Sequence, residues 1–204
     1  YRYNADMTLD TTWATSGKFT LQGAIQTIAV DASDFLAIVT NLTRGRIYLL
    51  NASGVQQWLY MSGAAVWLCY GAAFDSAGNV VSSVCPPSGI ATVGTVFARA
   101  DAAILLSFYT TSAVVNKTAV RTSDDRMFVT ANRASVPVGA IIEGYAVTGN
   151  PPLWSTMFSP VTNAPACLAY DSSLDAVVAA ATRAAAGNLY KFSVDGAQLA
   201  SYDI

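Results

Sequence analysis

Short apolar runs separated by polar turns repeat along the whole chain. Segments beginning at Thr27, Cys69, Thr118 and Ala166 each contain four such runs, with an Asp/Ser/Gly-type turn after the first and a short turn before the last. The runs are rich in Val, Ile, Leu, Tyr and Phe, and the turns in Asp, Ser, Gly and Asn, which is typical of β-strands joined by tight turns. The pattern therefore predicts four strands in each repeat.

The first turns of the four repeats set the period of the chain. They begin at Asp31, Asp75, Thr122 and Asp171, which are 44, 47 and 49 residues apart. A period of roughly 40 to 50 residues with four strands per unit is typical of β-propeller blades. We predict an all-β fold, in which one β-propeller-like domain over residues 1–204 is an array of four-stranded antiparallel blades. The predicted blades span approximately 23–62, 63–112, 113–160 and 161–204.

Residues 1–22 fit half a blade. The sequence YRYNADMTLDTTWA aligns with RIYLLNASGVQQWLY from the second half of the blade at 23–62. The last blade also ends in its own outer strands, so the two chain ends do not complement each other in one ring. Two explanations stay open: the natural chain is longer, or the spare strands pair with a neighbouring copy. The assembly strands would then contain Tyr1, Tyr3, Met7, Leu9 and Trp13.

The segment LDAVVAAATRAAAG in the last repeat is ambiguous. Its alanine content favours a helix when it is considered alone. Its position between neighbouring strand-like runs favours a strand. We predict a strand.

Two repeats share a more specific ending. Ser-Gly at 53–54 is followed by Trp58, and Thr-Gly at 148–149 is followed by Trp154, while Trp13 occupies a comparable place. This ending resembles the A-x-D-x-x-T-G-x-x-x-W motif of pyrroloquinoline-quinone-type (PQQ-like), tryptophan-containing β-propeller repeats. The resemblance implies a propeller.

The resemblance is degenerate and does not extend to the quinoprotein enzymes. The second repeat has no tryptophan at this place, and the fourth ends in Gln198-Leu199. Quinoprotein enzymes are expected to use a vicinal cysteine pair, calcium-binding acids and a catalytic aspartate around the cofactor. No vicinal cysteines occur in this chain, and none of the other residues can be matched.

Composition excludes several functional classes. The chain is 53% hydrophobic and only 12% charged, with a net charge of −2 and scattered cations, which argues against nucleic-acid binding. No apolar run approaches the roughly 18 to 20 residues of a membrane helix, so no membrane insertion is expected. The absence of histidine removes Ser-His-Asp triads, His-based zinc sites and imidazole bases. We predict a protein that is not an enzyme and has no cofactor besides covalent glycans.

Three Asn-X-Ser/Thr sequons point to a secreted or cell-surface glycoprotein. They begin at Asn41, Asn51 and Asn116, all in predicted loops or turns, where an acceptor would be exposed. Two of them flank the predicted third strand of the first blade. The sequence therefore predicts N-glycosylation and an extracellular location.

The cysteines give a second indication of the compartment. Cys69 and Cys85 lie symmetrically about Ala77, the middle of a predicted hairpin turn. They would face each other across adjacent strands at a separation that a disulfide tolerates, which favours an oxidising compartment. The alternative is two buried thiols. Cys167 has no mirror partner and is expected to be a core thiol.

Arginines, acidic pairs and tryptophans are the remaining candidates for a binding site. Arg44, Arg133 and Arg183 recur after the second strand of blades one, three and four, and could bind an anion or a sugar, or lie in solvent-facing loops. The tryptophans could stack on sugars, or pack in the core. Acidic pairs in the first turns could bind calcium or cap their own backbone. The pairs are Asp31 with Asp34, Asp124 with Asp125, and Asp171 with Asp175.

These observations lead to two functional hypotheses from different classes. The first is a non-catalytic secreted glycoprotein that assembles with copies of itself as a structural subunit of an extracellular filament or coat. The alternative is a propeller-based glycan- or protein-binding module of a larger cell-surface protein. A fragment of a propeller enzyme ranks third, because the site residues of such enzymes are missing.

Overall fold

The computed structural model describes residues 1–63, 68–85, 93–109, 113–133, 139–146, 148–158, 167–183 and 186–203. The strands of these segments form four separate antiparallel sheets, each made of four strands that follow one another in the chain. Within the same segments, no helix has the length and apolar character needed to cross a membrane.

Each sheet forms one blade. Blade 1 contains β1 (Ala24–Val30), β2 (Leu36–Asn41), β3 (Gly45–Leu50) and β4 (Gln56–Met61). Blade 2 contains β5 (Leu68–Phe74), β6 (Val80–Cys85), β7 (Val93–Phe97) and β8 (Ile104–Tyr109). Blade 3 contains β9 (Ala113–Arg121), β10 (Arg126–Arg133), β11 (Gly139–Ala146) and β12 (Gly149–Phe158). Blade 4 contains β13 (Cys167–Asp171), β14 (Ala176–Arg183), β15 (Ala186–Ser193) and β16 (Gln198–Asp203).

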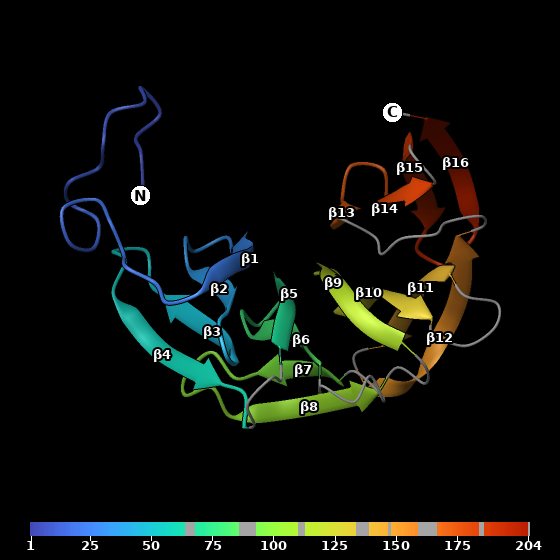
Figure 1. Cartoon of the computed structure of the whole chain (residues 1–204), viewed down its shortest axis with the longest axis horizontal. Helices are drawn as coiled ribbons and strands as arrows, with labels where there is room; N and C mark the ends of the chain where they lie inside the picture. The colour runs from blue at the N-terminus through green and yellow to red at the C-terminus, as the bar shows by residue number, and fades with distance from the viewer. Residues whose placement is uncertain are drawn as a thin grey trace.

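The four blades are arranged as a β-propeller. The first strands lie nearest the axis and the fourth strands lie at the periphery, and β1 contacts β5, β5 contacts β9, and β9 contacts β13 (Figure 1). The blades follow an arc, whose opening lies between the N-terminal segment beside blade 1 and blade 4 (Figure 1). The predicted all-β propeller fold is confirmed.

The hydrophobic core lies between the blades rather than inside any one of them. Successive strand residues point to opposite faces of a sheet, and in these sheets both faces are apolar. In blade 1, Val39 and Leu49 pack towards blade 2, whereas Ile38 and Leu50 pack towards the N-terminal segment. The same alternation buries apolar residues between blades 2 and 3 and between blades 3 and 4. Each blade therefore depends on a neighbour to cover its faces.

Residues 1–23 do not form the predicted half blade. They contain only two isolated β-bridges, Tyr3 with Leu9 and Thr15 with Lys18. Asp6 accepts hydrogen bonds from the backbone N–H and the hydroxyl of Thr8, and Met7 has a positive φ of 66°. Such side-chain-to-backbone bonds and left-handed residues favour turns over extended strands. The predicted assembly strands are therefore wrong as strands.

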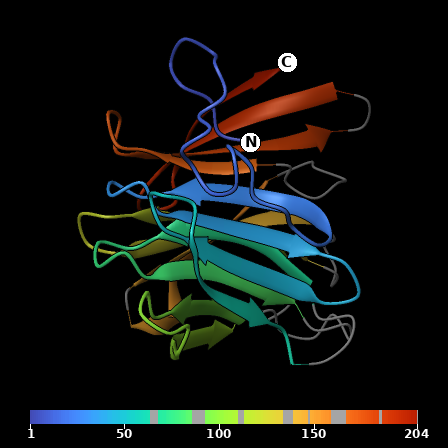
Figure 2. The same ribbon diagram turned by 90° about the vertical axis from the view of Figure 1, so that its left-hand side faces the viewer.

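The N-terminal segment nevertheless covers blade 1. Trp13 is 5% exposed and packs with Ile38, Tyr48 and Leu50 on the face turned away from blade 2. The N–H of Ala14 donates to the carbonyl of Ser53 at 2.8 Å. Figure 2 shows the segment crossing above the sheet of blade 1.

Tryptophans dock onto the last turn of the next blade in a repeated manner. Trp58 Nε1 donates to the Arg99 carbonyl, and Trp154 Nε1 donates to the Val194 carbonyl, each at 2.8 Å. Trp13 lies against the corresponding turn of blade 1 at Gly54, although its Nε1 has no partner among the described residues. These three tryptophans are thus packing residues between blades, as the core alternative predicted, whereas Trp67 lies outside the described residues.

Two local features of blades 3 and 4 depend on the sheets around them. The alanine-rich segment forms β14 and the start of β15, which confirms the predicted strand. The prolines at 151–152 lie in β12. β12 is the peripheral strand, and its register with β11 shifts between the pairs Ala146–Gly149 and Gly144–Trp154. Edge strands and bulges are where a sheet tolerates proline.

The docking geometry makes a prediction about Gly196. Its φ is +86°, and an added Cβ would lie 2.5 Å from Cδ2 of Trp154. We expect Gly196→Ala to lower the free energy of unfolding by about 2 kcal/mol in urea titrations, because it strains the backbone and displaces the indole. Gly63→Ala is the matched control, because its added Cβ has no atom of the described residues within 4 Å. It should change stability by under about 0.5 kcal/mol. Equal effects of the two substitutions would contradict the docking role of the Gly196 turn.

Candidate functional site

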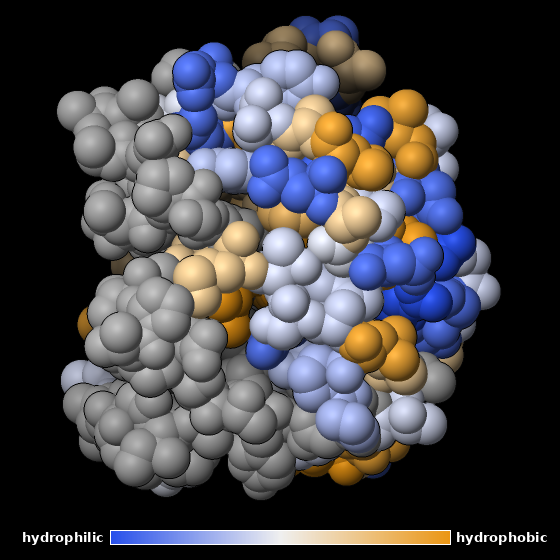
Figure 3. Space-filling view, turned by 90° about the vertical axis from the view of Figure 1, so that its right-hand side faces the viewer, coloured by the Kyte–Doolittle hydropathy of each residue, from blue (hydrophilic) through white to orange (hydrophobic). Residues whose placement is uncertain are grey.

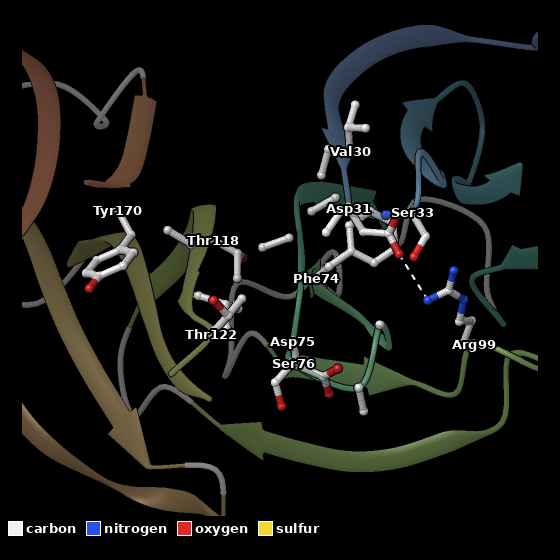
Figure 4. Close-up of a pocket in the computed structure, with 18 of the residues that line it drawn as sticks. Val30, Asp31, Ser33, Phe74, Asp75, Ser76, Arg99, Thr118, Thr122 and Tyr170 are labelled. Carbon is white, nitrogen blue, oxygen red and sulfur yellow. Dashed lines mark hydrogen bonds and ion pairs between the residues drawn. The ribbon is translucent and has the colours of Figure 1, made fainter. Parts of the chain in front are cut away.

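An axial hollow of about 810 Å³ lies where the four inner strands converge. The close-up in Figure 4 shows residues of all four blades around it. Its polar lining residues are Asp31, Ser33, Asp75, Ser76, Arg99, Thr118, Thr122 and Tyr170. The hollow combines small apolar and polar lining residues, and it is the first place to seek a ligand.

Small side chains keep the axial hollow open. Ala29, Ala72, Ala119 and Ala169 are among the residues that line it. Crowding between inner strands is tight, because a Cβ added to Gly71 would lie 2.5 Å from Oγ1 of Thr118. Larger side chains on these strands would fill the hollow or push the blades apart.

The acidic rim of the axial hollow links blade 1 to blade 2. Oδ1 of Asp31 accepts hydrogen bonds from the backbone N–H groups of Ser33 and Phe35, both at 2.8 Å. Its Oδ2 is 3.0 Å from the Arg99 guanidinium (Figure 4). The guanidinium also lies 3.8 Å from the centre of the Phe35 ring. Asp31 is therefore committed to its own turn and to the next blade.

Comparable links join the other blades. Asp125 of blade 3 accepts hydrogen bonds from the N–H and the hydroxyl of Ser76, at 2.6 and 2.7 Å. Arg121 lies 2.9 Å from Asp175 in blade 4, and a second pair, between Arg126 and Asp195, has the same separation. The first turns therefore connect neighbouring blades as well as neighbouring strands.

The acidic pairs serve as turn caps and blade links. Asp31 and Asp171 accept hydrogen bonds from backbone N–H groups two residues later, which confirms the Asx-turn interpretation for both. Within the described segments, no three acidic or thiol side chains are grouped so that they could hold a metal ion. At the axial hollow, Oγ1 of Thr118 is buried and makes no hydrogen bond among the described residues.

A buried polar pair in blade 3 was missed by the sequence analysis. Glu143 is 4% exposed, and the Tyr145 hydroxyl donates to its Oε2 at 2.7 Å. Burial raises the pKa of Tyr145 well above its usual value, and the charge of Glu143 and the hydrogen bond to it act in the same direction. The signal in the sequence is the single acid within the apolar run GAIIEGYA.

The sequon at Asn41 is not in a loop. Asn41 is the last residue of β2 and pairs with Gly45. Its Nδ2 donates to the Cys69 carbonyl at 2.8 Å, and its Oδ1 accepts from the Cys69 N–H at 3.0 Å. The atom that would carry a glycan therefore connects blade 1 to blade 2, and the predicted exposed position is wrong.

The other two sequons differ from each other. Asn51 lies in the turn between β3 and β4, as predicted, where its Oδ1 accepts from the N–H groups of Ser53 and Val55. Asn116 lies inside β9 rather than between blades, so its predicted loop location is wrong. It lies at a register shift in β9, where Lys117 pairs with Thr130 and Val115 pairs with the next residue, Ala131. The side chain of Asn116 lies outside the described part of the structure.

The predicted disulfide is not found among the described residues. Cys69 is a buried thiol that pairs with Val84 in the sheet, while Cys85 pairs with Leu68. A register shift after Cys69 breaks the mirror symmetry about the turn, so the two cysteines are not direct partners as predicted. The side chain of Cys85 is outside the described residues. Cys167 is exposed, which corrects the expected core position.

The three candidate arginines lie at the same hairpin of their blades. Arg44 is exposed in the turn between β2 and β3. Arg133 and Arg183 are the last residues of β10 and β14, and their side chains fall outside the described part of the chain. All three therefore belong to the second hairpin of a blade, whereas the axial hollow is lined by first turns. The structure does not bring these arginines to the hollow.

Comparisons with solved structures agree with the fold. A protein of unknown function from Bacteroides caccae has a TM-score of 0.63 at 10% identity, over 91% of this chain and 69% of that one. The Dos1 propeller has a TM-score of 0.60 at 12% identity, over 93% of this chain, which spans about half (51%) of that structure's length. No family model and no curated protein sequence matches the chain. At these identities the likeness establishes the β-propeller fold alone.

The raised pKa of Tyr145 predicts a pH dependence. A phenol whose pKa is higher in the folded state keeps its proton after the unfolded one ionises near pH 10, so stability falls as the pH rises beyond that point. The loss can reach about 1.4 kcal/mol per pH unit. We expect Tyr145→Phe to remove this component, so that its stability difference from the wild type shrinks between pH 9 and 11.5 in urea titrations. A difference that stays constant over this range would contradict the assignment.

Proposed function

We propose that this chain is a non-catalytic, secreted glycoprotein that assembles with copies of itself into an extracellular filament or coat. The observation that carries the proposal is the outward sheet face of blade 4. That face is apolar, and no further blade covers it among the described residues. Because every other blade face is packed against a neighbour, an equivalent covering element is expected here.

The register defines this face, which we call the blade 4 face. Its residues are Cys167, Ala169, Val178, Ala180, Leu189, Lys191, Ala200 and Tyr202. They are half-buried or exposed, and Tyr202 is 56% exposed. Their strand neighbours Val177, Ala179 and Tyr190 point the other way and are buried against blade 3. One lysine lies among seven uncharged side chains. Hydrogen bonds from Ser173 and the charge of Lys191 lower the pKa of Asp171, so one acid of the same blade lies near this lysine.

The opposite end of the arc offers a matching surface on the N-terminal segment. Tyr1 and Met7 are each 78% exposed, and Tyr3 is 55% exposed. Asp6 lies beside them, and its hydrogen bonds from Thr8 lower its pKa, so it stays ionised. Arg2 and Asp10 of the segment pair with each other at 3.4 Å. Asp6 makes no such pair among the described residues, and its charge is opposite to that of Lys191 on the blade 4 face.

The two surfaces are different, so their contact is head-to-tail. A heterologous contact of this kind produces rings when the rotation closes and filaments when it does not. The periphery of blades 3 and 4 is a weaker candidate, because Figure 3 shows hydrophobic and hydrophilic residues intermixed there. The blade 4 face and the N-terminal segment are therefore the proposed contact.

Further parts of the proposal rest on sequence and local geometry. The tryptophans at 13, 58 and 154 dock onto turns of the following blade, which supports degenerate PQQ-like repeats. The sequon at Asn51 is in a turn and supports N-glycosylation and an extracellular location. Nucleic acid and membrane insertion are not expected, since the net charge is −2 and the cations are scattered.

A glycan- or protein-binding module is the second candidate. The observation that favours it is the axial hollow, with a buried Thr118 hydroxyl that makes no hydrogen bond within the described residues. Binding of a glycan on an array that is lost in Thr118→Val, and kept in the exposed-site control Thr148→Val, would support this function. Equal binding by both variants would place any ligand elsewhere.

The head-to-tail contact predicts a charge-swap result. Lys191→Asp places an acid opposite Asp6 of the next copy, so we expect the association constant to fall roughly tenfold, or about 1.4 kcal/mol, in sedimentation velocity. Asp6→Lys alone should weaken association by a similar factor. The double variant should restore it, because the pair is rebuilt with its signs exchanged.

Leu189→Glu tests the apolar part of the same contact. A carboxylate on the blade 4 face should abolish association, whereas Leu153→Glu on the 52%-exposed site of β12 should not. Wild-type protein that stays monomeric at every concentration, or a double charge variant that remains weak, would contradict the proposal.

A further inference from the structure

A second pocket, which we call the interblade pocket, lies between blades 2 and 3 and has a volume of about 290 Å³. Its apolar lining residues are Val81, Val96, Leu105, Leu106 and Met127. Its polar lining residues are Asp75, Asn79 and Asp125. Leu105 is 57% exposed, and so the pocket reaches the surface.

The interblade pocket occupies the place where other blades carry an indole. Trp58 pairs with Leu49 in blade 1, and Trp154 pairs with Gly144 in blade 3. The corresponding pair in blade 2 is Leu106 with Val96. Both Leu106 and Val96 line the pocket. The smaller leucine thus leaves open a space that a tryptophan side chain fills at two other blade interfaces.

The mouth of the interblade pocket is acidic. Asp75 accepts hydrogen bonds from the backbone and side-chain N–H groups of Asn79, and Asp125 accepts from Ser76. Neither carboxylate forms an ion pair with an arginine or lysine in the described part of the chain. Two negative charges therefore stand at the mouth without a cation.

We infer that the interblade pocket binds a small aromatic cation, with its ring in the apolar hollow and its ammonium group at Asp75 and Asp125. An apolar cavity of about 150 Å³ is already large enough to stay dry and accept a benzene-sized ring. The pocket exceeds that size and approaches the roughly 300 Å³ of the smallest ordinary ligand sites. Its apolar lining offers a solitary water few polar partners.

The acidic mouth decides which aromatic ligands fit. An arylethylammonium ion brings a ring and a positive charge to the two kinds of surface that the pocket presents. A carboxylate on the same ring would meet Asp75 and Asp125 with like charge and be repelled. An alkylammonium without a ring would leave the hollow between Leu106 and Met127 empty.

The test is a titration of the full chain observed at the methionine methyl groups by ¹³C NMR. The probes are tryptamine, indole-3-acetate and ethylamine. Tryptamine should shift the Met127 methyl and leave that of Met7, on the N-terminal segment, unchanged. Binding of indole-3-acetate should be roughly tenfold weaker or worse, and ethylamine should give no Met127 shift. A Met127 signal that tryptamine leaves unmoved at millimolar concentration, or equal binding of the two indoles, would overturn the inference.

Two variants separate the ring site from the charge site. Leu106→Trp supplies the indole in place and should abolish the tryptamine shift, while Leu59→Trp, on β4 beside Trp58, should leave it intact. Asp125→Asn should lower the preference for tryptamine over indole-3-acetate by roughly fivefold. Retained tryptamine binding in Leu106→Trp, or an unchanged preference in Asp125→Asn, would overturn the inference. Binding to both variants is measured at the Met127 methyl group. The result therefore does not depend on whether the chain assembles with copies of itself.

Discussion

Every blade of this propeller depends on the burial of sheet faces that are apolar on both sides. Val39 and Ile38, successive residues of one strand, are buried in different interfaces, against blade 2 and against the N-terminal segment. An isolated sheet of this kind would leave both apolar faces in water, so the stability of each blade is set by its neighbours. The hydrogen-bonded and ionic links at the first turns, from Asp31 to Arg99 onwards, align blades that the apolar contacts hold together.

The docked indole is a repeated device, and its variations account for the unusual parts of the molecule. Trp13 supplies the indole that docks onto blade 1, but it belongs to a turn-rich segment rather than to a sheet, and that segment covers blade 1. In blade 2, Leu106 occupies the position of the indole, and the interblade pocket with its acidic mouth lies there. In blade 4 the corresponding position, opposite Lys191, is occupied by Ala200, on the face that none of the described blades covers. Assembly and ligand binding are thus proposed at the positions where the repeat departs from its own pattern.

The blades could be predicted from the sequence because alternation and turn residues are local signals. The turns after β1, β5, β9 and β13 and the alanine-rich β14 follow the predicted register. Features that depend on one-residue shifts or distant contacts could not be predicted. The bulge after Cys69 shifts the register, so Cys69 and Cys85 are not direct partners across the two strands. The side chain of Asn41 donates a hydrogen bond to Cys69 of the next blade, 28 residues along the chain. Residues 1–22 align with the second half of the first blade, yet the segment around Asp6 forms turns instead of strands. The buried Glu143–Tyr145 pair is marked in the sequence only by one acid in an apolar run.

Cryo-electron microscopy of the purified, concentrated protein would show whether a second copy covers the blade 4 face. We expect rings or filaments of copies in one repeating orientation, with density of one N-terminal segment over Leu189 and Lys191 of the next copy. Single particles with no density on that face, at concentrations well above those of the sedimentation experiments, would contradict this expectation.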